Sequence, residues 1–336
     1  MTFISYAQNY EDVILNRVLQ DVKNGFYIDV GANDPVEDSV TKAFYDNGWK
    51  GINIEPQEEF FTQLQQDRPE DINLNLAVSS TQKSIEFYVS KVRGWSTTDE
   101  LTSKDPERES LFSEIRTVQA KSLDEICEQN SVKQIHFLKI DVEGAEKDVL
   151  ESFSFSVKPW IVVVEATLPN SNIDASSNWE YILTQNSYKF VYFDGINKFY
   201  LSPQKPELEK HFAYPPNVLD EFIVFPLHEA LQENEELHKR DHLLDELLLK
   251  NAALKEELIL MNEELALIKL QMNMMVNSRS WQITKPLRLF VQYIKKLLGK
   301  STEHSEENIF SKNKSQELEY ANLSEDAKEI YQNLKK

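Results

Sequence analysis

The sequence of 336 residues contains one cysteine, only eight glycines and no long apolar run. The single cysteine, Cys127, excludes an intramolecular disulfide, which fits a reducing compartment. No window of about 18 consecutive apolar residues exists, so we expect no transmembrane helix. The N-terminus has no basic segment followed by an apolar run, so we expect no secretory signal. Together these absences predict a cytoplasmic protein that would meet a membrane only peripherally.

Basic residues are also scarce. The chain has 36 Lys and Arg against 56 Asp and Glu, which gives a formal net charge of −20. A protein that binds nucleic acid needs basic surface to displace counterions from phosphates, so we expect no nucleic-acid partner. Apolar residues make up 41% of the chain, which is enough for a sizeable hydrophobic core.

Residues 1–226 alternate between strand-like and helix-like stretches. We expect strands at 26–30, 51–55, 72–78, 84–89, 135–141, 160–165, 188–193, 199–202 and 221–225, and helices at 40–47, 56–67, 123–129 and 145–151. Strands that alternate with helices indicate an α/β domain with a parallel sheet covered on both faces. The polar stretch 96–116 has no clear periodicity and is expected to be a lid over a site or a mobile loop.

A second segment, residues 227–277, has apolar residues at alternating spacings of three and four. The a positions are Leu244, Asn251, Leu258, Leu265 and Met272, and the d positions are Leu247, Leu254, Met261, Ile268 and Met275. About five heptads without glycine or proline predict a coiled coil and therefore a homo-oligomer. Asn251 at an a position would fix the register. The alternative is a long helix that folds back onto its own domain.

Residues 278–300 reverse the charge of the chain. They include six basic side chains and no acidic one, together with apolar and aromatic residues at helical spacing. A basic amphipathic helix of this kind indicates peripheral contact with a membrane surface. The alternative is a cap that packs on the N-terminal domain. Residues 301–336 are polar and are predicted to form a flexible tail.

Candidate functional residues lie at the ends of the predicted strands, where open α/β sheets bind ligands. The strand 26–30 leads into Asp29-Val-Gly31-Ala-Asn33. Gly31 permits a tight turn, the amides of the next helix can hold a carboxylate, and Asp29 can accept from an ammonium group. The second and third glycines of the dinucleotide fingerprint are missing, which argues against a nicotinamide-dependent oxidoreductase.

Two further signals follow. Glu55 ends the next strand, 24 residues after Gly31, where an acidic side chain can accept from both ribose hydroxyls. The alternative is a solvated surface glutamate. Ala77 and Val78 end the third strand, where small apolar residues can form the wall of an adenine site.

The last signal is Lys139-Ile-Asp141-Val-Glu143-Gly144, a strand end with two carboxylates. Asp141 can deprotonate a substrate hydroxyl or bind a divalent cation, and Glu143 can share that role or cap the following helix. Asp141 and Glu165 end neighbouring strands and could share the cation. The alternative is that both carboxylates of the turn only complement the helix dipole.

Five stretches match a known family, and they are SYAQNYEDVIL at 5–15, FYIDVGAND at 26–34, GINIEP at 51–56, NLAVSS at 75–80 and FLKIDVEGAEKDVL at 137–150. In this order they resemble the FkbM-type family of class I S-adenosylmethionine-dependent methyltransferases. The resemblance implies a seven-stranded Rossmann-like fold, S-adenosylmethionine as the methyl donor and usually an O-methyl product. It places Asp29, Gly31 and Asn33 at the methionine end of the cofactor, Glu55 at the ribose, Ala77 and Val78 near the adenine, and Asp141 and Glu143 towards the acceptor. Pro35 departs from many relatives, which have a glycine there.

The motif SRSWQITKPLR at 278–288 resembles a segment found after coiled coils in bacterial surface-polysaccharide enzymes. That resemblance implies that the acceptor is a sugar hydroxyl of a surface polysaccharide or a related glycan. The rival hypothesis is a catalytically inactive methyltransferase fold, a scaffold that oligomerises and tethers glycan-assembly partners at the membrane.

Overall fold

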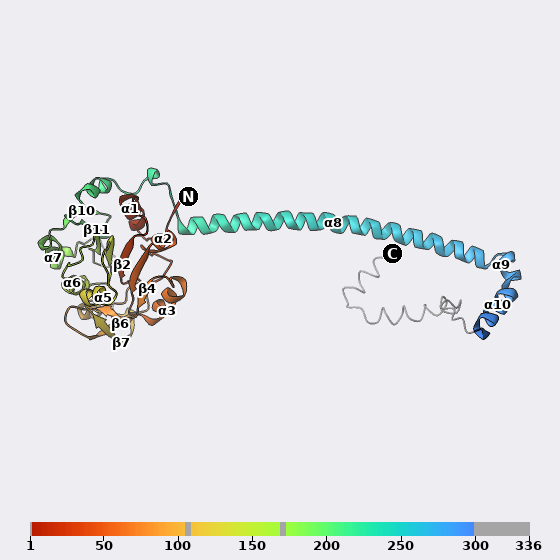
Figure 1. Cartoon of the computed structure of the whole chain (residues 1–336), viewed down its shortest axis with the longest axis horizontal. Coiled ribbons are helices and arrows are strands. Elements are labelled where there is room, and N and C mark those ends of the chain that lie inside the picture. The colour runs from red at the N-terminus through yellow and green to blue at the C-terminus, as the bar shows by residue number, and fades with distance from the viewer. Residues whose placement is uncertain (1, 105–108, 169–172, 299–336) are drawn as a thin grey trace. The chain divides into compact units, whose positions relative to one another are not determined.

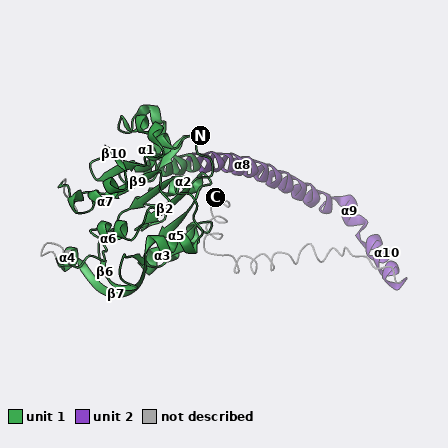
Figure 2. Ribbon diagram, turned by 60° about the vertical axis from the view of Figure 1, so that its left-hand side comes forward, with its two compact units in different colours: residues 1–237 green, residues 238–336 purple. Residues whose placement is uncertain are grey.

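The computed structural model describes residues 2–104, 109–168 and 173–298. The chain divides into two compact units, Met1–Leu237 and His238–Lys336 (Figure 2). The tail predicted at 301–336 and the last two residues of the basic segment, 299 and 300, lie outside the described residues.

A seven-stranded mixed sheet forms the centre of the first unit (Figure 1). In spatial order its strands are β10 (Lys189–Phe193), β11 (Asn197–Leu201), β9 (Ile161–Glu165), β8 (Phe137–Ile140), β2 (Phe26–Val30), β3 (Lys50–Ile54) and β4 (Ile72–Leu74). The five strands from β9 to β4 are parallel to one another, and β11 is antiparallel to both of its neighbours. The chain builds outward from β2 in both directions, so the strand order reverses between β2 and β8. Such a reversal opens a crevice at the carboxyl ends of the strands.

Helices cover both faces of this sheet, which confirms the predicted α/β class. They are α1 (Glu11–Val18), α2 (Lys42–Asp46), α3 (Glu58–Asp67), α5 (Leu123–Gln129), α6 (Glu146–Glu151) and α7 (Glu180–Gln185), with short 3₁₀ turns η2 (Ser176–Asn178), η3 (Pro206–Phe212) and η4 (Val218–Asp220). Side chains of a strand alternate between the two faces. Ile28 and Leu138 therefore join one buried core with residues of α5, α6 and α7, whereas Tyr27 and Phe137 join a second core with residues of α1 and α2.

A smaller sheet of three strands adjoins the crevice. It contains β5 (Ala77–Val78), β7 (Phe112–Lys121) and β6 (Ser84–Ser90), with α4 (Glu100–Ser103) and η1 (Glu109–Leu111) between β6 and β7. The strand predicted at 72–78 is split, because β4 joins the central sheet and β5 joins the small one. The stretch 96–116, expected to be a lid over a site or a mobile loop, contains α4 and η1 and ends in a strand, since β7 begins at Phe112 and pairs with β6. Most of β7 is exposed or half-buried, so its sequence lacks the apolar run that marks a buried strand.

The strand predicted at 221–225 does not extend the central sheet. It is β12 (Phe222–Val224), which pairs in parallel with β1 (Phe3–Ser5) to form a separate two-stranded sheet. This pairing holds residues 3–5 next to residues 222–224, directly before the start of the long helix.

The long C-terminal helix expected from the sequence is confirmed. It is α8 (Phe225–Val276), and α9 (Arg279–Ile283) and α10 (Lys285–Leu297) follow it. Ser278 ends the long helix and caps the next one, because its hydroxyl accepts a hydrogen bond from the Trp281 amide at 3.3 Å. Among the described residues, no helix has the length and apolar character that crossing a bilayer requires. Association of α8 into a coiled coil stays a prediction.

Candidate active site

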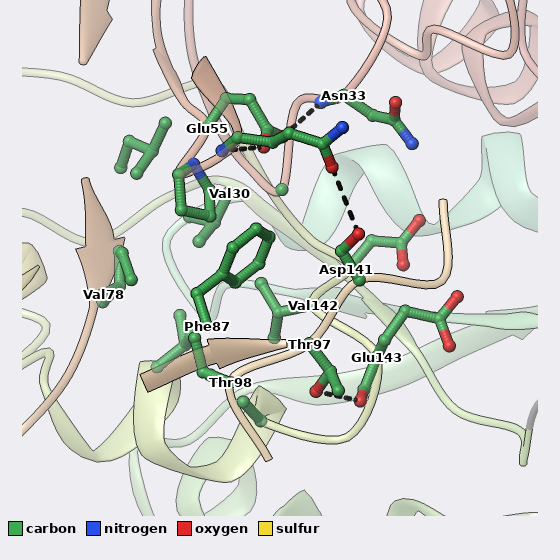
Figure 3. A pocket seen from close by; sticks show the side chains of 18 of the residues that line it. Val30, Asn33, Glu55, Val78, Phe87, Thr97, Thr98, Asp141, Val142 and Glu143 are labelled. Atoms are coloured by element: carbon green, nitrogen blue, oxygen red, sulfur yellow. Dashed lines mark hydrogen bonds between the residues drawn. The ribbon is translucent and has the colours of Figure 1, made fainter. Parts of the chain in front are cut away.

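Two adjoining hollows lie at the carboxyl ends of the central strands. The first is lined by the ends of β2, β3, β5 and β8, by Gly94 and by residues 96–98, and Figure 3 shows its side chains. Its empty volume, including the part open to solvent, is about 590 Å³. Seven of the eight residues that the sequence assigns to catalysis or cofactor binding line this hollow, and they are Gly31, Asn33, Glu55, Ala77, Val78, Asp141 and Glu143.

Gly31 makes the turn that brings β2 and β8 together at the floor of the site. Its φ is +79°, a left-handed conformation that residues with a Cβ rarely adopt. A Cβ at this position would lie 1.8 Å from the carbonyl oxygen of Asp141. The close approach of the two backbones therefore requires glycine here.

Glu55 is buried in the wall of the first hollow, which excludes the alternative of a solvated surface residue. Its two carboxylate oxygens accept hydrogen bonds from the Asn33 amide at 2.8 Å and the Gln57 amide at 2.7 Å. A carboxylate offers about four acceptor positions, so about two remain for a ligand. Burial raises the pKa of the Glu55 carboxyl to about 7, despite these two hydrogen bonds.

The apolar end of the first hollow is formed by more residues than the sequence indicated. Ala77 and Val78 are buried in β5, as expected, and Leu76 lies beside them. Phe87 also lines the hollow, although it belongs to β6, more distant in the chain (Figure 3). No local signal marks Phe87, because it reaches the site only through the pairing of β6 with β7. The resulting surface is suited to one flat, apolar ring.

Asn33 lines the first hollow, whereas Asp29 does not. Asn33 has a left-handed backbone and lines the hollow, and its buried Oδ1 atom has no hydrogen-bond partner among the described residues. Asp29 lines neither hollow. It is almost fully buried, accepts from the Thr41 hydroxyl at 2.9 Å and keeps its Oδ1 3.6 Å from the Lys139 ammonium group. The structure thus places Asp29 behind the lining, where it supports Thr41 and Lys139.

Lys139 is a site residue whose role the sequence did not reveal. Its ammonium nitrogen lies 3.3 Å from Oδ2 of Asp141, in addition to its contact with Asp29. Burial opposes its charge, but Asp29 and Asp141 outweigh this effect and raise the pKa of Lys139 above its ordinary range. A permanently charged lysine beside Asp141 holds that carboxylate in place.

Arg68 is a second residue that the sequence did not indicate. It follows α3 and is fully buried, and it donates to the Thr41 hydroxyl at 2.6 Å and to the Pro35 carbonyl at 3.1 Å. The departure from the family at Pro35 thus preserves a carbonyl that Arg68 uses to fix the loop after Gly31. The free-energy cost of burying an arginine is offset only when several acceptors such as these form hydrogen bonds with its guanidinium group.

The second hollow adjoins the first and shares five of its lining residues, Gly31, Asn33, Gly94, Asp141 and Glu143. It is strongly polar, and Trp95 is its large aromatic residue. The stretch 5–15, one of the five that resemble the family, supplies Gln8 and Glu11 to this hollow. Burial, together with the charge of Asp194, raises the pKa of Glu11 to about 8.

Three carboxylates converge between the two hollows. Asp141, Glu143 and Glu165 each place one oxygen within 4.8 Å of the others. Burial and the charges of Asp141 and Glu143 raise the pKa of Glu165 well above its ordinary value. Oxygen ligands of this kind also suit a hard divalent cation. The sequence predicts that Asp141 and Glu165 bind such a cation. Cation binding stays a prediction, and the structure places Glu143 beside these two carboxylates.

The capping role considered for Glu143 belongs to Glu146. The Glu146 carboxylate accepts from the amides of Gly144 at 3.0 Å and Val142 at 3.3 Å, whereas the Glu143 side chain lines both hollows. The Glu143 backbone has a φ of +55°, and its carbonyl accepts from the Thr97 hydroxyl at 2.7 Å. Glu143 is thus available to the site, and the turn is stabilised by its neighbour.

A parallel sheet with a strand reversal, a glycine turn and a buried carboxylate at the end of the next strand defines a ligand-binding doubly wound α/β domain. Residues 29–192 match the family model of the methyltransferase FkbM domain. The chain therefore contains a methyltransferase domain of the FkbM family, as its sequence motifs implied. A search of curated proteins found no match to the chain.

Proposed function

We propose that the protein is an S-adenosylmethionine-dependent O-methyltransferase that acts on a sugar hydroxyl of a surface polysaccharide or related glycan. The observation that carries this proposal is the meeting of the two hollows at Asp141. One hollow has an apolar end and a buried carboxylate, and the other is rich in hydrogen-bonding groups. A donor and an acceptor bound in them would meet beside one carboxylate. The cytoplasmic location stays a prediction.

The residues of the first hollow fit the parts of an adenosyl sulfonium. When bound, this cofactor supplies an activated methyl group. Glu55 would accept from the ribose hydroxyls, and Ala77, Val78 and Phe87 would enclose the adenine. The unpartnered Oδ1 of buried Asn33 would accept from the ammonium group of the methionine end. The parallel strands also follow the order 3-2-1-4-5 of Rossmann-like sheets, which supports a class I methyltransferase.

Asp141 is the group that we assign to proton removal. Asp141 would take the proton of the acceptor hydroxyl when the methyl group of the bound cofactor passes to the acceptor oxygen. Lys139, 3.3 Å away, orients the Asp141 carboxylate. Orientation of the two reactants and removal of one proton are the protein's main contributions.

The charge of the second hollow favours an acceptor that is neutral at the methylated ring. Six carboxylate side chains line it, and they are Glu11, Glu37, Asp38, Asp141, Glu143 and Glu165. Its two basic residues are already paired: Arg93 lies 2.6 Å from Glu37, and Lys139 contacts Asp141. A phosphate or uronate would meet net negative charge, whereas sugar hydroxyls can donate to the carboxylates. The Trp95 ring can stack on the apolar face of a sugar.

The proposed role of Glu55 predicts a pH-dependent affinity for S-adenosylmethionine. The ionised Glu55 carboxylate accepts from both ribose hydroxyls more strongly than the protonated group does, so binding should favour release of the proton that Glu55 holds below a pH of about 7. The affinity should therefore be constant above this pH and fall by up to about tenfold per pH unit below it. Calorimetric titration of the full-length protein with S-adenosylmethionine at several pH values measures this slope.

The matched variants are Glu55→Gln and Glu58→Gln, which change a buried and an exposed glutamate three residues apart. Glu55→Gln should weaken binding by about tenfold or more, because a charged hydrogen-bond acceptor is worth about 1.5–3 kcal/mol, and it should remove the slope. Glu58→Gln should behave like the wild type. Failure of the wild-type protein to bind S-adenosylmethionine would favour the inactive scaffold instead.

We also propose that α8 forms the coiled coil of a homo-oligomer. All nine apolar a and d residues between Leu244 and Met275 are exposed on this helix, with Leu258 at 47% and Leu254 at 64%. A helix of 52 residues cannot bury such a stripe by itself, and heptad spacing directs it towards another helix. A second copy of this chain supplies the same stripe.

This proposal predicts loss of the oligomer in the double variant Leu254→Asp/Leu258→Asp, which places charges at a d and an a position. The double variant Leu249→Asp/Leu260→Asp makes the same chemical change at positions f and c, outside the seam. We expect light scattering to give the mass of one chain for the first variant and a multiple of that mass for the second and for the wild type. Equal masses for all three proteins would contradict the coiled coil.

A further inference from the structure

Helix α10 (Lys285–Leu297) separates polar and apolar residues into two continuous faces. At about 100° per residue, its polar side chains all lie within an arc of about 100°. These are Lys285, Arg288, Gln292, Lys295 and Lys296. The remaining arc of about 200° carries only apolar or aromatic residues and Pro286. Leu287, Phe290 and Leu297 on this arc are 62–66% exposed, so the apolar face is uncovered in the single chain.

Every charged residue on the polar face of α10 is basic. The sequence has no acidic residue between Glu264 and Glu303, although the whole chain has a net charge of −20. Arg288 is engaged locally, because its guanidinium lies 3.7 Å from the centre of the Trp281 ring and donates to the Trp281 carbonyl. Among the described residues, no carboxylate forms an ion pair with Lys285, Lys295 or Lys296. These three ammonium groups are therefore available to an external anion.

We propose that α10 is a docking helix for an anionic membrane surface. The wide apolar face would enter the boundary between headgroups and acyl chains, and the lysines at its margins would contact anionic headgroups. Arg288, stacked on Trp281, fixes the joint between α9 and α10. This inference does not depend on the methyltransferase activity.

The shape of the apolar face argues against a second copy of this chain as the occupant. A coiled-coil seam uses two positions in each heptad, so a partner helix would leave much of an arc of about 200° in water. Helix pairs also draw on oppositely charged residues beside the seam, and α10 offers basic residues only. A lipid surface covers a wide arc and supplies negative charge at the same time.

Flotation of the full-length protein with vesicles tests the proposal. One vesicle preparation is phosphatidylcholine alone, and the other contains equal parts of phosphatidylcholine and phosphatidylglycerol. We expect flotation with the anionic vesicles, and we expect added NaCl to reduce it. In Lys295→Glu/Lys296→Glu, the partition coefficient for anionic vesicles should fall by about thirtyfold or more, since each basic residue near the surface contributes about a factor of five.

Two further variants make the result specific. Lys23→Glu/Lys133→Glu produces the same change of net charge at two exposed lysines of the first unit and should float like the wild type. Phe290→Ser/Ile294→Ser keeps every charge but removes apolar surface, and it should also lose flotation. Circular dichroism checks that each variant keeps its helix content, so that loss of flotation is not loss of folding.

Three outcomes would overturn the proposal. One is equal flotation of the wild type and Lys295→Glu/Lys296→Glu. Another is equal binding to vesicles with and without phosphatidylglycerol. The third is a wild-type protein that floats with neither preparation, which would assign the apolar face to a protein surface, either a second copy or the first unit.

Discussion

Replacement of Gly31 by alanine should weaken the binding of S-adenosylmethionine and reduce the rate of methyl transfer by at least about a hundredfold, since a displacement of about 1 Å in a site can lower a rate by that factor. The new Cβ would lie 1.8 Å from the Asp141 carbonyl oxygen, and the backbone at this position has a φ of +79°. Either the turn or the end of β8 must move, and both line the two hollows. Calorimetric titration measures the loss.

Gly48→Ala is the matched control for this prediction. Gly48 has a φ of +83°, but nothing lies within 4 Å of a Cβ built there. Its replacement should cost about 1–2 kcal/mol of stability from the left-handed backbone alone and leave the affinity unchanged. Thermal unfolding of both variants separates instability from loss of the site. Wild-type affinity in a folded Gly31→Ala protein would remove the proposed cofactor position.

Asp141→Asn should reduce kcat for methyl transfer by about 10²–10⁴-fold while S-adenosylmethionine still binds, because general-base catalysis typically contributes that much. The amide keeps the shape of the side chain but cannot accept the hydroxyl proton. Release of S-adenosylhomocysteine with a neutral glycan acceptor measures the rate. Asp67→Asn, an exposed aspartate at the end of α3, should keep the wild-type rate. A rate in Asp141→Asn close to wild type would show that another group takes the proton.

Treatment of the wild-type enzyme with EDTA separates the two roles considered for Asp141. A carboxylate that acts only as a base needs no metal, so the rate should persist in the chelator. A loss of rate that Mg²⁺ or Mn²⁺ restores would instead assign a cation to the cluster of Asp141, Glu143 and Glu165. Calorimetric titration with Mn²⁺ alone would then show binding that Glu165→Gln weakens.

The sequence was sufficient to predict that most residues of the candidate site lie close together. Gly31, Glu55 and Asp141 each stand at or just after the end of a parallel strand, and parallel strands in one sheet bring these ends to the same edge. A local pattern of strand and turn therefore predicts a shared location without any knowledge of contacts. The same is true of α8, whose heptad spacing is a local property of the chain.

Residues that act through distant pairing could not be identified in this way. Phe87 reaches the first hollow because β6 pairs with β7, and Arg68 becomes a site residue only when it meets the Pro35 carbonyl. The assignment of Asp29 to a position behind the lining, next to Lys139, likewise depends on how two adjacent strands place their side chains.

The amino-acid sequence by itself determined the α/β class, the long helix and the set of strand ends from which the site is built, because periodicity and turn residues act over a few positions. Only the tertiary structure decided which buried charges share a cavity. Burial and the neighbouring carboxylates raise the pKa of Glu165, Lys139 holds Asp141, and Glu146 rather than Glu143 stabilises the turn. Electrostatic energies depend on distances across the fold and on burial, and neither quantity is a property of neighbouring residues in the chain.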